Sequence, residues 1–288
     1  MGKYKKPKQH LHRNFVYLQH DTVLNSLSAF EAGKVDEIIE KTSEATDRGL
    51  EAGVGKGPVK VGGSRKRQAQ VQEELIRRRT NFSAFESWYQ AMRAQDALGE
   101  FEEWDLEVRN ALEVGDTIQF SAYVELSPLH LMMATFSSFA EGLNKPGSVF
   151  QANSKEAADA RKTAAMMQSW VVGRAGGRST AVYFLPEGVP APRIVGRVED
   201  QYILGGLDTL QGRFIIVGQV DSLLSHSDKM SVIRVIRDVP PTPKEIEVAG
   251  EALAHFKDAT PELGIELKDD DITLSYPTVV LTPIAIYR

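Results

Sequence analysis

The segment 225–228, Ser-His-Ser-Asp, combines the residue types of a hydrolase triad: a nucleophile, a base and an acid. Such triads are assembled in space from distant segments, because residues adjacent on one backbone cannot normally converge on one substrate. The chain also has no GxSxG motif, which would present a serine on a sharp turn. We therefore interpret residues 225–228 as a polar turn.

Signals for phosphate and metal chemistry are incomplete in this chain. The run Gly-Val-Gly-Lys-Gly at 53–57 resembles part of a phosphate-binding loop, but leucine replaces the first glycine and Gly57 replaces the required hydroxyl. His10 and His12 lie in a lysine-rich arm, which offers no fixed scaffold for zinc. Asp269–Asp271 lack the alternation and the glycine of a calcium loop. Since cysteine is also absent, we predict no catalytic triad, no metal site and no cofactor.

Acid–base chemistry is a remaining alternative for the second half of the chain. Glu199 and Asp200 lie beside Tyr202, where an expected strand ends. If the expected strands converge there, the two carboxylates are candidates for general acid and base. Perturbed pKa values in one concave pocket would support that reading.

Charge is distributed unevenly along the chain. Residues 1–80 carry 16 Lys/Arg and 10 Asp/Glu, a formal charge of +6, whereas residues 81–288 carry 18 and 29, a formal charge of −11. The basic segment 65–79 contains our candidate residues for contact with a partner, which are Arg65, Lys66, Arg67, Arg77, Arg78 and Arg79. The acidic remainder argues against a dedicated nucleic-acid-binding protein. Electrostatic binding of nucleic acid through the basic segment stays an alternative.

Apolar spacing predicts the elements that must position these residues. Strict alternation over 118–125 indicates a half-buried strand, and further strands are expected at 15–18, 180–185, 193–198, 213–220, 231–237 and 278–287. Capping residues and helical spacing indicate helices that begin near residues 21, 35, 64, 83, 128, 154 and 243. The helix that begins with Ser127-Pro128 is expected to turn one stripe to a core, formed by Leu129, Met132, Phe136, Phe139 and Leu143.

This order of elements predicts an α+β fold, because regular strand–helix alternation is missing. We expect a helical N-terminal part and a C-terminal, mostly antiparallel sheet with packed helices. The expected divisions are a basic flexible arm at 1–14, a short strand and helices at 15–48, a glycine-rich flexible loop at 49–63, a helical segment at 64–110, and an α+β core at 111–288 that ends in a terminal strand.

No apolar run approaches the ~20 residues that span a bilayer. The basic start is followed by only four apolar residues at 15–18, which is too short for a signal peptide. We therefore expect a cytoplasmic protein without a membrane segment. The composition, with 42% hydrophobic and 25% charged residues, is that of an ordinary globular chain.

Short motifs at both ends resemble a family of uncharacterised bacterial proteins. The run FVYL at 15–18 resembles the "YLD" strand that opens the family, although two residues separate Leu18 from Asp21, where the acid normally follows leucine. The run FIIVGQV at 214–220 resembles an internal "F-x-V-x-G-x-V" strand, and PIAIYR at 283–288 resembles the terminal "P-x-A-I-Y-R". The family is similar to the first component of the Dodola anti-phage system, whose partner is a ClpB-like AAA+ ATPase.

The resemblance implies a non-enzymatic binding or adaptor protein in anti-phage defence or stress, with nucleotide hydrolysis in another protein. It transfers no catalytic residue to this chain, and the sequence specifies neither a ligand nor an oligomeric state. The alternatives are an enzyme with an unrecognised site in the C-terminal core and an electrostatic binder of nucleic acid.

Overall fold

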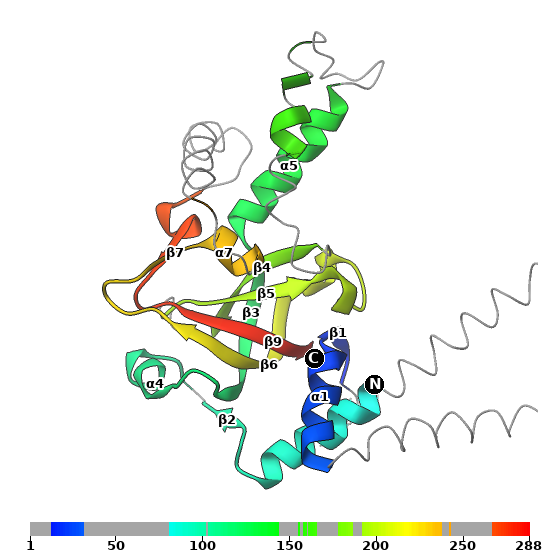
Figure 1. Cartoon of the computed structure of the whole chain (residues 1–288), viewed down its shortest axis with the longest axis vertical. Coiled ribbons are helices and arrows are strands. Elements are labelled where there is room, and N and C mark those ends of the chain that lie inside the picture. Colours follow the sequence, from blue (N-terminus) through cyan, green and yellow to red (C-terminus); the bar gives the residue numbers. More distant parts are fainter. Residues whose placement is uncertain are drawn as a thin grey trace, which may run out of the picture. The chain divides into compact units, whose positions relative to one another are not determined.

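The structure of the 288-residue chain is a computed structural model. It describes residues 13–31, 81–101, 103–143, 155, 158–159, 161–165, 178–186, 192–237, 242 and 267–288. The chain divides into two compact units, one formed by residues 1–18 with 99–288 and the other by residues 19–98 (Figure 1). His10, His12, the run 53–57 and the six candidate residues of the basic segment lie outside the described residues.

The unit 19–98 contains two described helices, α1 (His20–Glu31) and a helix at 81–94. The helix expected to begin near residue 21 begins at His20, so Asp21 lies in its first turn, where a negative charge is favourable. Apolar side chains at helical spacing are buried in both helices, namely Val23, Leu27, Phe85, Trp88, Tyr89 and Met92.

Five strands of the other unit close into a barrel. They are β3 (Thr117–Leu126), β4 (Ser179–Pro186), β5 (Ile194–Glu199), β6 (Gly212–Leu223) and β9 (Val279–Tyr287). The order around the barrel is β3-β4-β5-β9-β6, and β6 pairs with β3 again. All of these pairs are antiparallel except β5–β9, which is parallel. The predicted α+β fold with a mostly antiparallel C-terminal sheet is confirmed.

This barrel has a recognisable connectivity. Along the chain its strands are β3, β4, β5, β6 and β9, so the third strand pairs in parallel with the fifth, and the fourth closes on the first. We note that this is the connectivity of the OB-fold, a five-stranded Greek-key barrel. The sequence pattern indicated the strands but not this closure.

Two short strands fill the edges that the barrel strands leave open. β1 (Phe15–Leu18) pairs with β9 from Ala285 onward, beyond the part of β9 that pairs with β5. β2 (Gly99–Glu100) pairs in parallel with Ile118 and Gln119 near the start of β3, before the part of β3 that pairs with β4. A strand edge without a partner leaves its backbone N–H and C=O groups unpaired. β1 and β2 therefore pair with the stretches of β9 and β3 that β5 and β4 do not reach.

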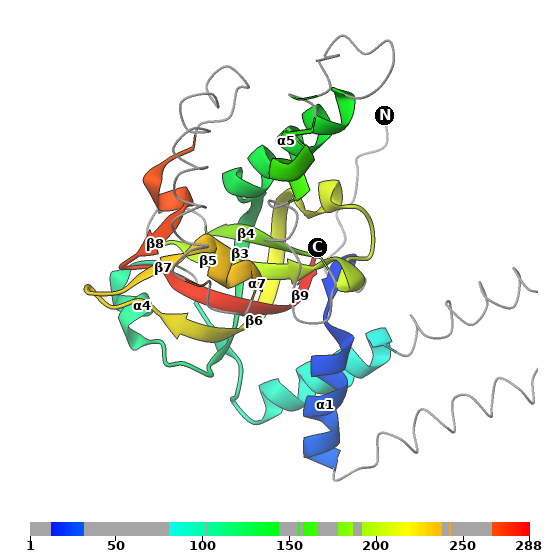
Figure 2. The ribbon, with the colours of Figure 1, turned by 45° about the horizontal axis from the view of Figure 1, so that its top comes forward.

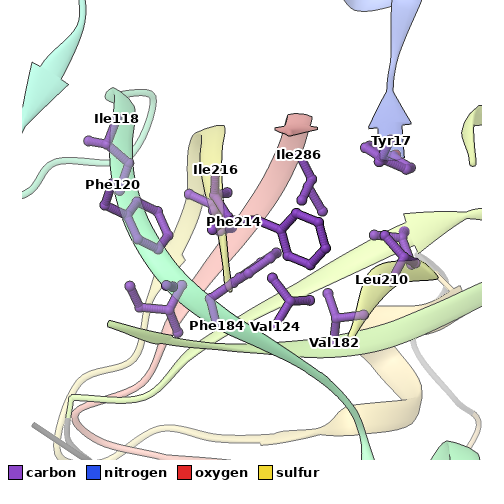
Figure 3. Packing of buried hydrophobic residues seen from close by; sticks show 14 of the residues in the cluster. Tyr17, Ile118, Phe120, Val124, Val182, Phe184, Leu210, Phe214, Ile216 and Ile286 are labelled. Atoms are coloured by element: carbon purple, nitrogen blue, oxygen red, sulfur yellow. The ribbon is translucent and has the colours of Figure 1, made fainter. Parts of the chain in front are cut away.

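The barrel interior is filled by alternate residues of each strand. In β3, Ile118, Phe120, Ala122 and Val124 are buried, which confirms the alternation read from the sequence. Figure 3 shows side chains from β3, β4, β6 and β9 that meet around Phe184 and Phe214. Leu210 comes from η3 (Leu207–Leu210), a short 3-10 helix, and joins the same cluster.

A second apolar layer lies on the outside of the barrel. α5 (Pro128–Gly142) and α7 (Val232–Arg237) pack their buried residues against outward side chains of β4 and β5, including Ala181, Tyr183 and Val195. Figure 2 shows α7 in this layer. Of the stripe predicted for α5, Leu129, Met132 and Leu143 are buried, but Phe139 is 40% exposed.

The predicted strand at 231–237 is wrong beyond its first residue. Ser231 ends β7 (Lys229–Ser231), and α7 follows directly. Val232, Ile233, Val235 and Ile236 are buried, and this spacing gives one face of a short helix. The run of β-branched residues favours a strand by propensity alone. The helix forms instead because it buries these side chains against the barrel wall.

The remaining described elements connect the barrel to its surroundings. They are α4 (Leu106–Ala111), η2 (Asp200–Tyr202), η5 (Asp269–Asp271) and β8 (Thr273–Ser275), which pairs with β7. Trp104 precedes α4 and is buried, and its indole N–H donates to Pro192 O at 2.6 Å, so this segment is anchored by Trp104. No helix among the described residues combines the length and apolar character that a membrane crossing requires.

Candidate functional site

The face that binds ligands in many OB barrels is covered in this chain. OB-folds bind oligonucleotides and oligosaccharides on the face of their second and third strands, which correspond here to β4 and β5. The outward side chains Ala181, Tyr183 and Val195 of these strands are buried in the layer formed with α5 and α7. These positions on β4 and β5 are therefore not open to a ligand, whereas the margins of the layer contain cavities.

One cavity of about 300 Å³ lies at such a margin, between α5, the start of β4 and the two 3-10 helices η2 and η3. We call it the α5 cavity. Its floor contains the buried residues Met133, Ser179 and Thr180, and exposed charged residues, Arg178 and Asp200 among them, stand at its rim. A cavity with an apolar and hydroxyl floor and a few charged groups has the character of a small-molecule site.

The α5 side of the cavity is formed by one face of the helix. His130, Ala134, Ser137 and Glu141 line it, and their separations of three and four residues place them one above another. The buried face that holds α5 on the barrel begins with Leu129, one position away. Packing of that face against β4 therefore turns the neighbouring polar face toward the cavity.

The rim carries a pair of opposite charges held by strand pairing. Arg178 precedes β4 and Asp200 follows β5, and Ser179 is the register partner of Glu199 in this antiparallel pair. The backbone N–H of Asp200 donates to Arg178 O at 3.0 Å. Partial burial of the Asp200 carboxyl raises its pKa above the ordinary value of 3.8, and the Arg178 guanidinium opposes that shift.

His130 is the second titratable group of the cavity with a perturbed pKa. Burial lowers its pKa below the ordinary value of 6.5, because a protonated imidazole loses hydration there. Its Nδ1 lies 3.4 Å from Thr180 Oγ1. At neutral pH the imidazole is therefore uncharged and able both to donate and to accept a hydrogen bond.

The structure separates the two carboxylates predicted as acid–base candidates, Glu199 and Asp200, and places Tyr202 in the core. Only Asp200 lines the α5 cavity. Glu199 accepts from Arg197 Nη2 at 3.3 Å and from Gln201 Nε2 at 2.9 Å. Tyr202 is 8% exposed and belongs to the barrel core, where its ring meets Tyr17 edge-on at 6.2 Å.

Sequence reasoning missed Arg178, Thr180 and His130. A signal for His130 existed, because it begins a polar face at helical spacing on an otherwise apolar helix. Arg178 and Thr180 gave no such signal, since the partner strand and its register decide what they face.

The other motifs have structural roles. Residues 225–228 form the predicted turn, in which the Asp228 carboxylate accepts from the Ser225 N–H at 2.8 Å. The His226 ring instead stacks on Tyr276 with centroids 3.6 Å apart. Asp271 is buried in η5 and accepts from the Lys268 N–H at 3.0 Å. The described part of the chain contains no group of three or more His, Asp or Glu arranged to hold a metal ion.

Comparison with known proteins identifies a family. The model of a domain of unknown function, DUF6414, matches residues 12–287, so the chain belongs to this family. Comparisons with curated proteins and with solved structures give no match. The family match includes no link to the Dodola system, so that relation rests on the short motifs alone.

Proposed function

We propose that this DUF6414 protein is a cytoplasmic binding protein whose α5 cavity binds a small polar molecule. The α5 cavity carries this proposal. Its volume of about 300 Å³ lies at the lower end of the range for ligand pockets, and its buried floor and charged rim supply both contact area and orientation.

The side chains of the cavity favour a small zwitterion. A guanidinium such as that of Arg178 pairs with a ligand carboxylate, and the Asp200 carboxylate accepts from an ammonium group. His130 and Thr180 add neutral hydrogen-bonding groups beside the apolar side chain of Met133. A ligand with both charges and a short apolar part matches this arrangement.

Ligand-detected NMR with a set of small amino acids, amines and carboxylic acids tests the proposal on the full chain. We expect zwitterions to bind more strongly than molecules with one charge. Arg178→Gln and Asp200→Asn are expected to reduce affinity by about tenfold or more each, because each removes a charge-assisted hydrogen bond. Asp270→Asn is the matched control, since this exposed side chain lies outside the cavity. Equal binding by Asp200→Asn and wild type would contradict the site.

We further propose that the protein acts as an adaptor in anti-phage defence or stress, with an AAA+ ATPase of the ClpB type as its partner. This proposal is supported by the motif resemblance and by the six basic residues of the segment 65–79. A pull-down of the full chain from its host, followed by mass spectrometry, is expected to recover the ATPase. Neutralising the six residues is expected to abolish recovery. Recovery of the chain alone would contradict the adaptor role.

One observation favours an enzyme as the second candidate. The pKa of His130 is lowered and that of Asp200 is raised, both by burial, and both groups line the α5 cavity. Such perturbed groups in one pocket are typical of general acid–base sites. Turnover of an ester, amide or phosphoester probe that is lost in both His130→Gln and Asp200→Asn would favour catalysis over simple binding.

A further inference from the structure

A second cavity, of about 430 Å³, lies beside α7 at another margin of the outer layer. We call it the α7 cavity. It is formed by α7, β5, β6, β7 and β9, and the side chains used below are Arg197, Asp221, Ser222, Arg234 and Thr282. It shares no lining residue with the α5 cavity, so the two sites can be tested separately.

Two guanidinium groups from different elements line the α7 cavity. Arg197 points outward from β5, and its side chain is only 18% exposed. Its Nη2 lies 3.3 Å from Glu199 Oε1, a contact that fixes the direction of the guanidinium. Arg234 comes from α7, whose buried face of Val232, Ile233 and neighbours is packed against the barrel wall. The two cations are therefore carried by rigid elements rather than by loops.

Two hydroxyl groups and one carboxylate also line the cavity. Ser222 is on β6 and Thr282 is on β9, and these two strands are paired, with Ser222 opposite Val280. Both hydroxyls can donate to an anionic oxygen. Asp221 adds a carboxylate, which accepts hydrogen bonds from hydroxyl groups but repels a phosphate placed beside it. The cavity therefore offers two cationic groups, two hydroxyl groups and one accepting carboxylate.

We propose that the α7 cavity binds a small phosphorylated compound that carries hydroxyl groups, of the sugar-phosphate class. The guanidinium groups of Arg197 and Arg234 hold the phosphate, since planar guanidinium groups match phosphate oxygens in pairs. The hydroxyls of Ser222 and Thr282 donate to the remaining phosphate oxygens. Asp221 accepts from the sugar hydroxyls, and the volume of about 430 Å³ accommodates a ligand of this size.

Isothermal titration calorimetry of the full chain with three probes tests the assignment. The probes are inorganic phosphate, ribose 5-phosphate and ribose. We expect ribose 5-phosphate to bind more tightly than phosphate, and ribose alone to give no heat of binding. The order of the three affinities distinguishes the phosphate contact from the hydroxyl contact, because inorganic phosphate lacks the sugar hydroxyls and ribose lacks the phosphate.

Substitutions in the lining test whether the measured heat of binding comes from the α7 cavity. Arg234→Gln is expected to weaken ribose 5-phosphate binding by about tenfold or more, because a charge-assisted hydrogen bond is lost. Arg234 is exposed, so this variant keeps the fold, and Thr282→Val gives an independent second test. Asp221→Asn is expected to weaken ribose 5-phosphate but not phosphate. Arg213→Gln, on the outer face of β6 and outside the cavity, is the matched control.

Three results would overturn the assignment. They are no binding of ribose 5-phosphate in the millimolar range, equal binding of ribose 5-phosphate and phosphate, and unchanged binding in Arg234→Gln and Thr282→Val. Binding of zwitterions at the α5 cavity is unaffected by any of these results, so failure here does not decide the proposal for that site.

Discussion

Gly196 shows how the packing around one position can require a glycine. A Cβ atom at this position would lie 2.5 Å from Phe184 Cε2 and 2.9 Å from Leu281 O, which is closer than side-chain carbons approach. Gly196 therefore leaves the space that the Phe184 ring of β4 and the Leu281 carbonyl of β9 occupy. The sequence shows a glycine within an expected strand, but only the register of three strands explains why it is there.

His130 provides a test at the residue scale through pH. Its pKa is lowered by burial, so below pH 6.5 the unfolded chain binds a proton that the folded chain does not. The free energy of unfolding is therefore expected to fall as the pH drops below 6.5. In His130→Gln this contribution is absent, and the dependence on pH is expected to be flatter.

Urea unfolding of both proteins at a series of pH values measures this difference. Asp200 acts in the opposite direction near its ordinary pKa of 3.8, because burial raises its pKa, so the series is kept above about pH 5. His226→Gln is the matched control, since His226 is exposed in the turn 225–228. An identical pH dependence in wild type and His130→Gln would contradict the buried, uncharged state of His130.

At the scale of elements, β9 explains why a proline is tolerated inside a central strand. β9 pairs with β5 up to Leu281 and with β1 from Ala285 on the same edge. Pro283 lies between these two stretches and opposite Gly218, where the pairing with β6 shifts its register. Proline lacks the N–H of a ladder bond, and its position in this gap avoids the loss of a required donor.

This arrangement predicts opposite outcomes for two substitutions in β9. Ala285 is paired with both Leu18 of β1 and Val217 of β6, so Ala285→Pro is expected to destabilise the fold by about 1–3 kcal/mol or more through lost and unsatisfied hydrogen bonds. Pro283→Ala is expected to change stability little. Guanidinium unfolding of the two variants checks this, and equal midpoints would contradict the assigned pairing.

Elements with a clear periodicity could be predicted, and elements defined by their environment could not. Alternation over 118–125 correctly indicated β3, because one face of that strand is buried. The run 232–236 fits a strand by propensity and a helix by spacing, and only contact with the barrel wall distinguishes them. The same limit applies to the site: Asp200 was found as one of two adjacent carboxylates, whereas Arg178 became a candidate only through its pairing across β4 and β5.

At the scale of the whole molecule, the strand connectivity is typical of oligonucleotide-binding barrels, whereas the net charge disfavours binding of a polyanion. The strand order is that of a barrel that often binds oligonucleotides, but fold alone does not establish a site. α5 and α7 cover the relevant face of β4 and β5. The full sequence also carries a formal net charge of −5, which opposes approach of a polyanion. Positive charge is concentrated instead in residues 1–80.

We therefore expect the full chain not to bind a single-stranded oligonucleotide at physiological salt. At low salt we expect weak binding through the basic segment 65–79, with an affinity that falls linearly on a log–log plot against salt concentration, because phosphate contacts release counterions. Fluorescence anisotropy with a labelled oligothymidine measures both. Neutralising Arg65, Lys66, Arg67, Arg77, Arg78 and Arg79 is expected to abolish the low-salt signal. Binding at physiological salt that survives this change would show that the barrel itself binds nucleic acid despite its covered face.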